Sequence, residues 1–401
     1  MSATSTCPVV TSATESSQEE LTEAASHFFG STAGFAFRRC SGGVNNKTYY
    51  LDTPSGSTYC LRIYNNGCNL PRVRYEHAVI AALRPLSFSF ATPHFLPALS
   101  SASGATFATV ASGAQTCCAE LIPGGPASGL ASARSIGFAT AELVRGLAGV
   151  CISADIAPAN PLYRNFYAAH HSITREAFMA CARGDAAFAA VREPMDYLVA
   201  AIESTEALIA RIVAMDPPLP TQLINADLHT DNVLVDPATQ RVTGVLDFEF
   251  AAVDWRAMEL VVGVSKYCGA QDPKPLLEGY IAGYKEGGGS FTAAEVQLIP
   301  ELIILRILNN VVFFVGRYLA KEDVSGEGAW PACTQGRHPC TAPPPHLTFC
   351  TFTLPPPPLH SPLSPSLAGL QCTHSAAGGS QRMQRGCAPA LPAAWRPREV
   401  V

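Results

Sequence analysis

The sequence predicts an α+β protein with a small antiparallel β-rich lobe followed by a larger, mainly helical lobe. Short runs rich in aromatic and β-branched residues gather in residues 26–123, whereas apolar residues at helical spacing dominate residues 124–323. The charge divides at the same point, because the first segment holds seven Lys and Arg against three acidic residues and the second holds 15 against 23. A chain of 401 residues that is 48% hydrophobic has enough apolar side chains to fill both cores.

The β-rich lobe is expected to contain one sheet and one helix. A cluster of turn-forming residues, 53–57, separates two apolar runs and predicts a β-hairpin. Apolar residues that share one face predict a helix over Arg72–Leu83. The segment Pro123-Gly124-Gly125-Pro126 then breaks the chain, and we place the boundary between the lobes there. The expected strands are Phe35–Cys40, Lys47–Asp52, Thr58–Tyr64, Thr106–Val110 and Cys117–Ile122.

The helical lobe is expected to combine long helices with short strands. Helical periodicity covers Ser135–Val150, Glu193–Met215 and Ala293–Ala320. Gln222–Val235 and Arg241–Phe248 differ, because their apolar runs are too short for helices and are flanked by polar turn residues. These two segments are predicted to be short strands that carry loops.

Both ends of the chain are expected to be disordered. Residues 1–25 are rich in Ser and Thr, carry four Glu and contain no Lys or Arg, which is the opposite of a transit peptide. Fourteen of residues 324–401 are Pro and helical periodicity disappears there, so this tail cannot offset its ordering entropy by burial. The 14 Cys are scattered without a C-x-x-C pair or a hydrophobic leader, so we expect reduced thiols and a cytoplasmic protein.

Composition also limits the classes of partner. The net charge is -5 and the pI is about 6.1, which leaves no basic excess for a phosphate backbone or for anionic lipid. The most apolar stretch, Leu302–Leu319, is interrupted by two Arg and two Asn, so we interpret it as a buried helix and not as a membrane span. A small molecule is therefore the expected partner, with no nucleic acid and no membrane, and the oligomeric state stays open.

The most informative residues lie in the two short-strand segments. An apolar strand delivers Asp227 to a loop, Asn232 follows five residues later, and a further apolar run holds the far end of the loop. Fifteen residues after Asn232, a second apolar run ends in Asp247. A single Asp is more often a turn residue or a helix cap than a base. The spacing Asp-x-x-x-x-Asn, followed by Asp-Phe at another strand end, is instead typical of a kinase catalytic loop and metal loop.

Phosphoryl transfer from ATP needs side chains of this kind. A carboxylate accepts or orients the proton of the acceptor hydroxyl, and Asp227 fits this role. An amide oxygen and a second carboxylate hold Mg²⁺ against the phosphates. Asn232 and Asp247 fit these roles because Mg²⁺ takes a few hard oxygen ligands from a protein. The sequence therefore predicts ATP and Mg²⁺ as cofactors.

The motif Asn-Ala-Asp-Leu-His-Thr-Asp-Asn-Val-Leu-Val-Asp, residues 225–236, resembles the Brenner-type motif of the aminoglycoside phosphotransferase and choline kinase superfamily. Within that superfamily it is similar to the homoserine-kinase-like branch, and the resemblance covers about residues 26–320. It implies a protein-kinase-like fold of two lobes, in which the β-rich lobe binds nucleotide and ATP lies in the cleft above the helical lobe.

The resemblance also implies nucleotide-binding residues. Residues 41–47 resemble the loop that covers ATP, where glycines let backbone amides approach phosphates, although a Gly-Gly hairpin is often an ordinary turn. Arg62 occupies the position of the phosphate-binding lysine of kinases, and Glu76 is its expected partner unless it lies at the surface. Residues 119–124 resemble the adenine-binding hinge. The expected nucleotide-binding residues are Gly42, Gly43, Asn45, Arg62, Glu76, Glu120 and Ile122.

The sequence departs from the family pattern around the catalytic loop. The family has His two residues before the catalytic Asp, whereas this chain has Asn225, whose amide is expected to support the loop instead. Glu259 aligns with a family Asp that braces the catalytic loop, so we assign it a structural role. Asp254 is expected to cap the helix that follows it.

Three further polar residues near the motif have less certain roles. Glu249 is expected on the same side of the chain as Asp247, where it would support the metal or an ammonium group. His229 and Asp231 would contact substrate, brace the loop or face solvent, and the last two roles are favoured because polar loop residues commonly bind backbone groups.

These features predict an ATP-dependent kinase that transfers the γ-phosphate to a hydroxyl of an amine-bearing metabolite. The acidic excess of the helical lobe favours an amine on the acceptor. Homoserine is the first choice by resemblance, and hydroxylysine, choline and aminoglycosides fit the charge equally well. The alternative is a catalytically inactive pseudokinase, which Arg62 and Asn225 favour, whereas the presence of all three residues Asp227, Asn232 and Asp247 favours the enzyme.

Overall fold

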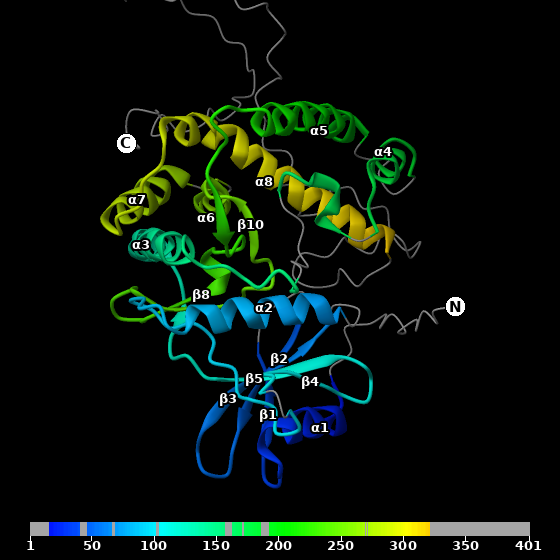
Figure 1. Cartoon of the computed structure of the whole chain (residues 1–401), viewed down its shortest axis with the longest axis vertical. Coiled ribbons are helices and arrows are strands. Elements are labelled where there is room, and N and C mark those ends of the chain that lie inside the picture. Colours follow the sequence, from blue (N-terminus) through cyan, green and yellow to red (C-terminus); the bar gives the residue numbers. More distant parts are fainter. Residues whose placement is uncertain are drawn as a thin grey trace, which may run out of the picture.

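An antiparallel sheet forms the N-terminal lobe and a group of helices forms the C-terminal lobe (Figure 1). The computed structural model describes residues 16–40, 46–65, 69–101, 104–156, 163–170, 172–185, 192–268, 270 and 272–320. Within these ranges the α+β class and the order of the two lobes are as predicted from the sequence, and the fold class is confirmed.

The sheet of the N-terminal lobe has five strands in the order β1-β2-β3-β5-β4. In β2 and β3, Asp52 pairs with Thr58, so the hairpin turn consists of residues 53–57 as predicted. β5 pairs with β3 and returns the chain toward the C-terminal lobe. The strands are β1 (Ala36–Arg39), β2 (Asn46–Asp52), β3 (Thr58–Tyr64), β4 (Ala108–Thr109) and β5 (Gln115–Glu120).

Part of the segment predicted to be disordered is a helix. Residues 18–25 belong to α1 (Gln18–Phe29), and the Ser17 hydroxyl caps this helix by accepting a hydrogen bond from the Glu20 N–H at 3.1 Å. Burial against the sheet offsets the ordering entropy of this helix, so the prediction is wrong for residues 18–25. Residues 1–15 and the tail 324–401 lie outside the described residues. The side chains buried against the sheet are Leu21, Ala24, Ala25 and Phe28.

Helix α2 (Leu70–Leu83) lies between the sheet and the C-terminal lobe (Figure 1). The Asn69 side chain caps it by accepting a hydrogen bond from the Arg72 N–H at 3.2 Å. The apolar side of α2 belongs to a core that continues into the helical lobe. The two lobes therefore share one hydrophobic core behind the cleft.

The C-terminal lobe contains six helices among the described residues, together with two small sheets. One sheet has the order β6-β8-β9 and the other pairs β10 with β7. The strands are β6 (Gly125–Pro126), β7 (Thr221–Ile224), β8 (Val233–Val235), β9 (Val242–Val245) and β10 (Ala252–Trp255). The helices are α3 (Gly129–Leu147), α4 (Arg175–Gly184), α5 (Arg192–Val213), α6 (Ala257–Tyr267), α7 (Pro273–Glu286) and α8 (Ala293–Leu319), with short 3-10 turns at Phe166–Ala169 and Thr230–Asn232.

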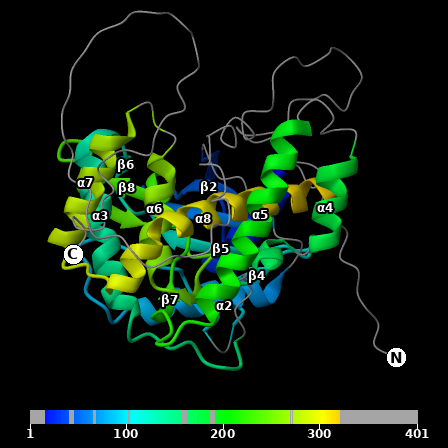
Figure 2. The ribbon, with the colours of Figure 1, turned by 90° about the horizontal axis from the view of Figure 1, so that it is seen from above.

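Helix α8 crosses the helical lobe from α6 to α4 (Figure 2). By length and composition alone it could span a membrane, yet 56% of its most apolar window is buried inside the protein. This burial agrees with the interpretation of Leu302–Leu319 as a core helix. The first half of α8 packs on α6, which follows the metal loop.

Two glycines allow α3 and α7 to approach each other closely, and we expect Gly283→Ala to destabilise the lobe. A Cβ atom at Gly283 would overlap the backbone oxygen of Arg134, and one at Gly137 would overlap that of Tyr280. Because backbone cannot move aside as a flexible side chain can, the free energy of unfolding should fall by roughly 3 kcal/mol. Urea denaturation measures this change. Gly184→Ala is the control, because among the described residues no atom beyond its chain neighbours and its own helix backbone lies within 4 Å of its Cβ position. Equal losses in both variants would contradict the packing argument.

Candidate active site

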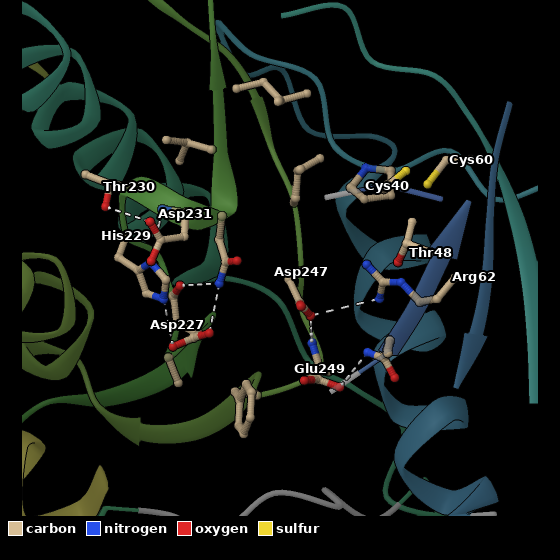
Figure 3. A pocket seen from close by; sticks show the side chains of 18 of the residues that line it. Cys40, Thr48, Cys60, Arg62, Asp227, His229, Thr230, Asp231, Asp247 and Glu249 are labelled. Carbon is tan, nitrogen blue, oxygen red and sulfur yellow. Dashed lines mark hydrogen bonds and ion pairs between the residues drawn. The ribbon is translucent and has the colours of Figure 1, made fainter. Parts of the chain in front are cut away.

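A cleft of about 1400 Å³ separates the two lobes. One wall comes from the sheet, the back from the connection between the lobes, and the opposite wall from the catalytic and metal loops. Figure 3 shows Asp227 and Asp247 on the C-terminal side facing Arg62 of β3. Asn232 lines the same cleft. The structure therefore brings together the four side chains that the sequence assigns to chemistry, metal binding and phosphate binding.

Side chains within the motif itself shape the catalytic loop. Asn225 donates its side-chain N–H to the Asp247 carbonyl at 2.8 Å and accepts the Asp227 N–H at 3.0 Å. It thus links the catalytic loop to the metal loop. This agrees with the expectation that the Asn225 amide supports the catalytic loop in place of the family's His. Between them, Ala226 has a φ of 66°, a left-handed conformation that is uncommon outside glycine.

Glu259 braces this loop from α6. Its fully buried carboxylate accepts the backbone N–H groups of Asn225 at 2.6 Å and Ala226 at 3.2 Å. Burial raises the pKa of Glu259 to about 7, although the two backbone donors act in the opposite direction. The geometry matches the structural role predicted from the sequence.

The Asp227 carboxylate is held on both oxygens. Oδ2 accepts the Asn232 side-chain N–H at 2.8 Å, while Oδ1 lies 3.0 Å from Arg306 Nη2 and 3.4 Å from His229 Nε2. Burial alone would raise the pKa of Asp227. The hydrogen bond from His229, with the charges of Arg306 and Lys266, outweighs burial and lowers this pKa. Asp227 is therefore ionised at neutral pH.

His229 orients Asp227 from within the same loop. Its Nδ1 accepts the Asp231 N–H at 3.2 Å, so the neutral ring carries its proton on Nε2, which faces Asp227. His229 is buried, whereas the Asp231 side chain is 70% exposed and pairs with Lys266 at 3.2 Å. His229 thus braces the loop, and Asp231 is largely solvated.

The two expected metal ligands lie at the same end of the β8-β9 hairpin. Val233 pairs with Val245, and the Leu246 N–H donates to the Asn232 carbonyl at 2.8 Å, so Asn232 and Asp247 are brought together. Asp247 has a φ of 39°, a second left-handed residue in the site. Burial raises its pKa, the nearby carboxylates Glu249 and Glu76 raise it further, and Arg62 lowers it.

This cluster of carboxylates fits a divalent cation. A raised pKa at Asp247 means that negative charge there is incompletely compensated by the protein, and a bound cation would compensate it. Within the described ranges, no three His, Cys, Asp or Glu side chains converge on a complete metal site. Mg²⁺ commonly takes one or two protein ligands together with nucleotide phosphates, so Asn232 and Asp247 suit it.

Arg62 and Glu76 form a buried pair between β3 and α2. Arg62 Nη1 lies 2.9 Å from Glu76 Oε1 and 4.0 Å from Asp247 Oδ1, and the Tyr64 hydroxyl donates to Glu76 at 3.0 Å. The Glu76 side chain is 1% exposed, which excludes the alternative that it lies at the surface. Glu76 acts through Arg62, because it does not itself line the cleft.

We expect Arg62→Gln to lower both stability and turnover, because it leaves Glu76 buried without a counter-charge. Breaking a buried ion pair in this way costs about 3 kcal/mol or more. Thermal unfolding and ATP kinetics measure the two effects. The double variant Arg62→Gln/Glu76→Gln should recover most of the stability but not the turnover. Recovery of both would show that Arg62 has no role at the phosphates.

The connection between the lobes offers free backbone groups to a ligand. Glu120 and Ile122 both line the cleft. Among the described residues, the backbone groups of Leu121 and Ile122 have no hydrogen-bond partner, as adenine binding at a hinge requires. The Glu120 side chain is 58% exposed and pairs with His94, and its backbone N–H donates to the His94 carbonyl at 3.1 Å, so Glu120 offers no free N–H to adenine. Gly42, Gly43 and Asn45, also expected to bind nucleotide, lie outside the described residues.

Of two expectations near the metal loop, one needs revision. The Glu249 carboxylate contacts Asn46 at 3.1 Å and Arg72 at 3.5 Å, so it links the lobes beside the metal loop. Glu249 also lines the cleft, and its support of the metal or of an ammonium group stays a prediction. Asp254 is not a helix cap, because it lies in β10 opposite Gln222 and accepts the Trp255 N–H at 2.7 Å.

Sequence reasoning missed Arg306, which contacts the catalytic carboxylate from α8. Its position could have indicated a functional role, because a charged residue within the most apolar stretch of the chain is rarely buried without a partner. From the sequence, however, this Arg was used only to exclude a membrane span. Arg306 is 79 residues from Asp227 in sequence, and only the packing of α8 on the lobe brings the two together.

A carboxylate held in a loop, two oxygen ligands on the next hairpin and a paired arginine opposite them define a phosphotransferase of the protein-kinase-like class. The profile of the phosphotransferase enzyme family, APH, matches residues 36–299. The chain belongs to this family and is an enzyme of the phosphotransferase class.

Solved structures agree on the fold. The microcompartment-associated aminopropanol kinase is 19% identical with a TM-score of 0.54, and the match covers 75% of this chain and 94% of that one. Amicoumacin kinase hAmiN, in complex with AMP-PNP and Ca²⁺, is 15% identical with a TM-score of 0.54 over 77% and 87% of the two chains. The GDP and kanamycin complex of APH(2")-IIia is 13% identical with a TM-score of 0.51 over 76% and 98%. The comparison with curated proteins gave no match.

Proposed function

We propose that the protein transfers the γ-phosphate of ATP to a hydroxyl group of a small, amine-bearing molecule, with Mg²⁺ as the metal. The observation that carries this proposal is the convergence of Asp227, Asn232, Asp247 and Arg62 on one cleft. Family membership supports phosphoryl transfer, and the free backbone groups at residues 121–122 support a nucleotide base at the back of the cleft.

Each residue has a defined task in this proposal. Asp227 accepts the hydrogen bond of the acceptor hydroxyl and holds the oxygen toward the γ-phosphate. Because its pKa is low, Asp227 mainly orients the hydroxyl, and the proton leaves late in the transfer. Arg62 binds phosphate oxygens while Glu76 holds it in place. Asn232 and Asp247 would hold Mg²⁺, which supplies charge neutralisation at the phosphates.

An amine on the acceptor is supported by two observations. Residues 124–323 carry 23 acidic residues against 15 Lys and Arg, which favours cationic ligands. One of the similar structures is named an aminopropanol kinase, and another is a complex that holds kanamycin. Homoserine remains our first choice of acceptor, with hydroxylysine, choline and aminoglycosides as alternatives that the same test covers.

The test separates an active kinase from a pseudokinase. The melting temperature is measured with ATP, with and without Mg²⁺, and phosphate transfer is then measured to a panel of amino alcohols and hydroxy amino acids. A kinase should be stabilised by ATP more strongly with Mg²⁺ and should form ADP only with an acceptor. Stabilisation that does not depend on metal, with no transfer to any acceptor, would favour the pseudokinase.

A further inference from the structure

The guanidinium of Arg306 lies beside Asp227, and one of its nitrogens, Nε, has no hydrogen-bond partner among the described residues. Its Nη2 contacts Asp227 Oδ1 at 3.0 Å, and its Nη1 donates to the side-chain oxygen of Asn310. The guanidinium carbon lies 5.8 Å from the centre of the Tyr163 ring. Its Nε is buried and has no hydrogen-bond partner among the described residues, and the residue is only 8% exposed. A buried donor without a partner destabilises the folded protein unless a ligand supplies an acceptor.

Four other arginines of this chain show how these donors hold a carboxylate, whereas the buried Nε of Arg72 has no hydrogen-bond partner among the described residues either. Each of four arginines holds one carboxylate by the edge that carries Nε and Nη2, which matches the spacing of two carboxylate oxygens. Arg306 uses only Nη2 of this edge, because the other oxygen of Asp227 is bound to Asn232. The arginine edge at the catalytic Asp is therefore half occupied. The fully occupied pairs are Arg38 with Asp52, Arg134 with Glu286, Arg175 with Glu206 and Arg256 with Glu295.

Arg306 also changes the charge of the cleft around Asp227. The helical lobe as a whole is acidic, but the residues that line the cleft carry five cations against six carboxylates. The cleft is therefore close to neutral, and an acceptor that carries an acid as well as an amine is compatible with it. The cations are Arg39, Arg62, Lys266, Arg306 and Arg317, and the carboxylates are Glu120, Asp227, Asp231, Asp247, Glu249 and Asp254.

We propose that Arg306 binds a carboxylate group of the acceptor through Nε, the half of this edge that Asp227 leaves free, next to the hydroxyl that Asp227 orients. Arg306 is then the residue that selects hydroxy amino acids over amino alcohols, choline and aminoglycosides. This inference rests on the proposed kinase function, and it narrows the acceptor to a class that carries both an amine and an acid.

Matched pairs of acceptors test the inference. Each pair differs only by the carboxylate: homoserine with 3-aminopropan-1-ol, serine with ethanolamine, and hydroxylysine with 1,5-diaminopentan-2-ol. Binding to the protein with AMP-PNP and Mg²⁺ is measured by calorimetry, and kcat/KM is measured with ATP. In at least one pair, the wild-type protein should prefer the carboxylate-bearing member by about 10- to 100-fold, as expected for hydrogen bonds to a charged group.

Variants then assign the preference to Arg306. Arg306→Gln should reduce the ratio within that pair to about one, mainly by raising KM for the carboxylate-bearing member, and Arg306→Lys should retain part of the ratio. Lys266→Gln removes a cation from the same cleft, and Arg256→Gln breaks an arginine-carboxylate pair outside it. Both controls should leave the ratio unchanged. If the ratio depended on the overall charge of the cleft or on stability, one of the controls would lower it as well.

Several results would overturn the inference. One is that every decarboxylated member binds as well as its carboxylate-bearing partner, or better. A second is that the ratio does not change in Arg306→Gln, and a third is that it falls as much in Lys266→Gln as in Arg306→Gln. If Arg306→Gln does not fold, the wild-type preference and the Arg306→Lys ratio decide. Absence of binding by all six compounds also overturns it, whereas Mg²⁺-dependent ATP binding tests the kinase function separately.

Discussion

Asp227→Asn is expected to reduce kcat by about 10²- to 10⁴-fold while ATP affinity stays near the wild-type value. The carboxylate is the group that accepts the hydroxyl hydrogen bond, and an amide of the same shape cannot take the proton. In the proposed function the nucleotide is bound by other residues, Arg62 at the phosphates and residues 120–122 at the base, so its affinity should not depend on residue 227. Single-turnover phosphate transfer and AMP-PNP calorimetry measure the two quantities.

The folded state should lose some stability. Asn keeps an oxygen for Arg306, which bonds the present carboxylate at 3.0 Å, but its NH2 group then faces the Asn232 N–H and the counter-charge of the buried Arg306 is lost. The melting temperature should therefore fall, and turnover is measured well below it. Asp236→Asn is the control, because Asp236 lies in the turn after β8, outside the cleft, where its carboxylate accepts the Thr239 N–H at 2.8 Å. Wild-type turnover in Asp227→Asn would remove Asp227 from the chemistry, and a comparable fall in Asp236→Asn would point to a folding defect.

Asp247→Asn is expected to abolish the effect of Mg²⁺ on nucleotide binding and to reduce turnover by at least about 10²-fold. In the wild-type protein, a ligand at about 100 times its Kd stabilises the fold by about 2.7 kcal/mol. The variant should lose the part of this stabilisation that depends on Mg²⁺. Melting curves with AMP-PNP over a range of Mg²⁺ concentrations measure it directly.

The same variant should melt no lower than the wild-type protein without ligand. Burial and the charges of Glu249 and Glu76 raise the pKa of Asp247 in the folded state. At any pH above the ordinary pKa of Asp, the ionised Asp247 therefore destabilises the folded protein. A neutral amide removes this unfavourable charge. Glu249→Gln is the control, since it removes a carboxylate two residues away that contacts Arg72 and Asn46. An equal loss of the Mg²⁺ response in Glu249→Gln would mean that Asp247 is no specific ligand.

Local sequence was sufficient for features that depend on neighbouring residues. The hairpin at residues 53–57 and the strand bounds of β3 follow from turn residues and alternation, and both agree with the structure. The loop from Asp227 to Asn232 follows from its two flanking apolar runs. Helix α1 was missed because a short helix is stabilised mainly by the surface on which its apolar residues pack, and that surface, the sheet, cannot be identified from the local sequence.

The sequence by itself determined which chemical groups this protein has and in which order they come: a carboxylate, an amide and a second carboxylate at kinase spacing, after an arginine in a basic lobe. Only the tertiary structure decided which of them meet. Arg306 reaches Asp227 from α8, and Glu249 turns to Arg72 of α2. Contacts between residues so far apart depend on how helices pack, and that packing is set by the whole core and not by any local pattern.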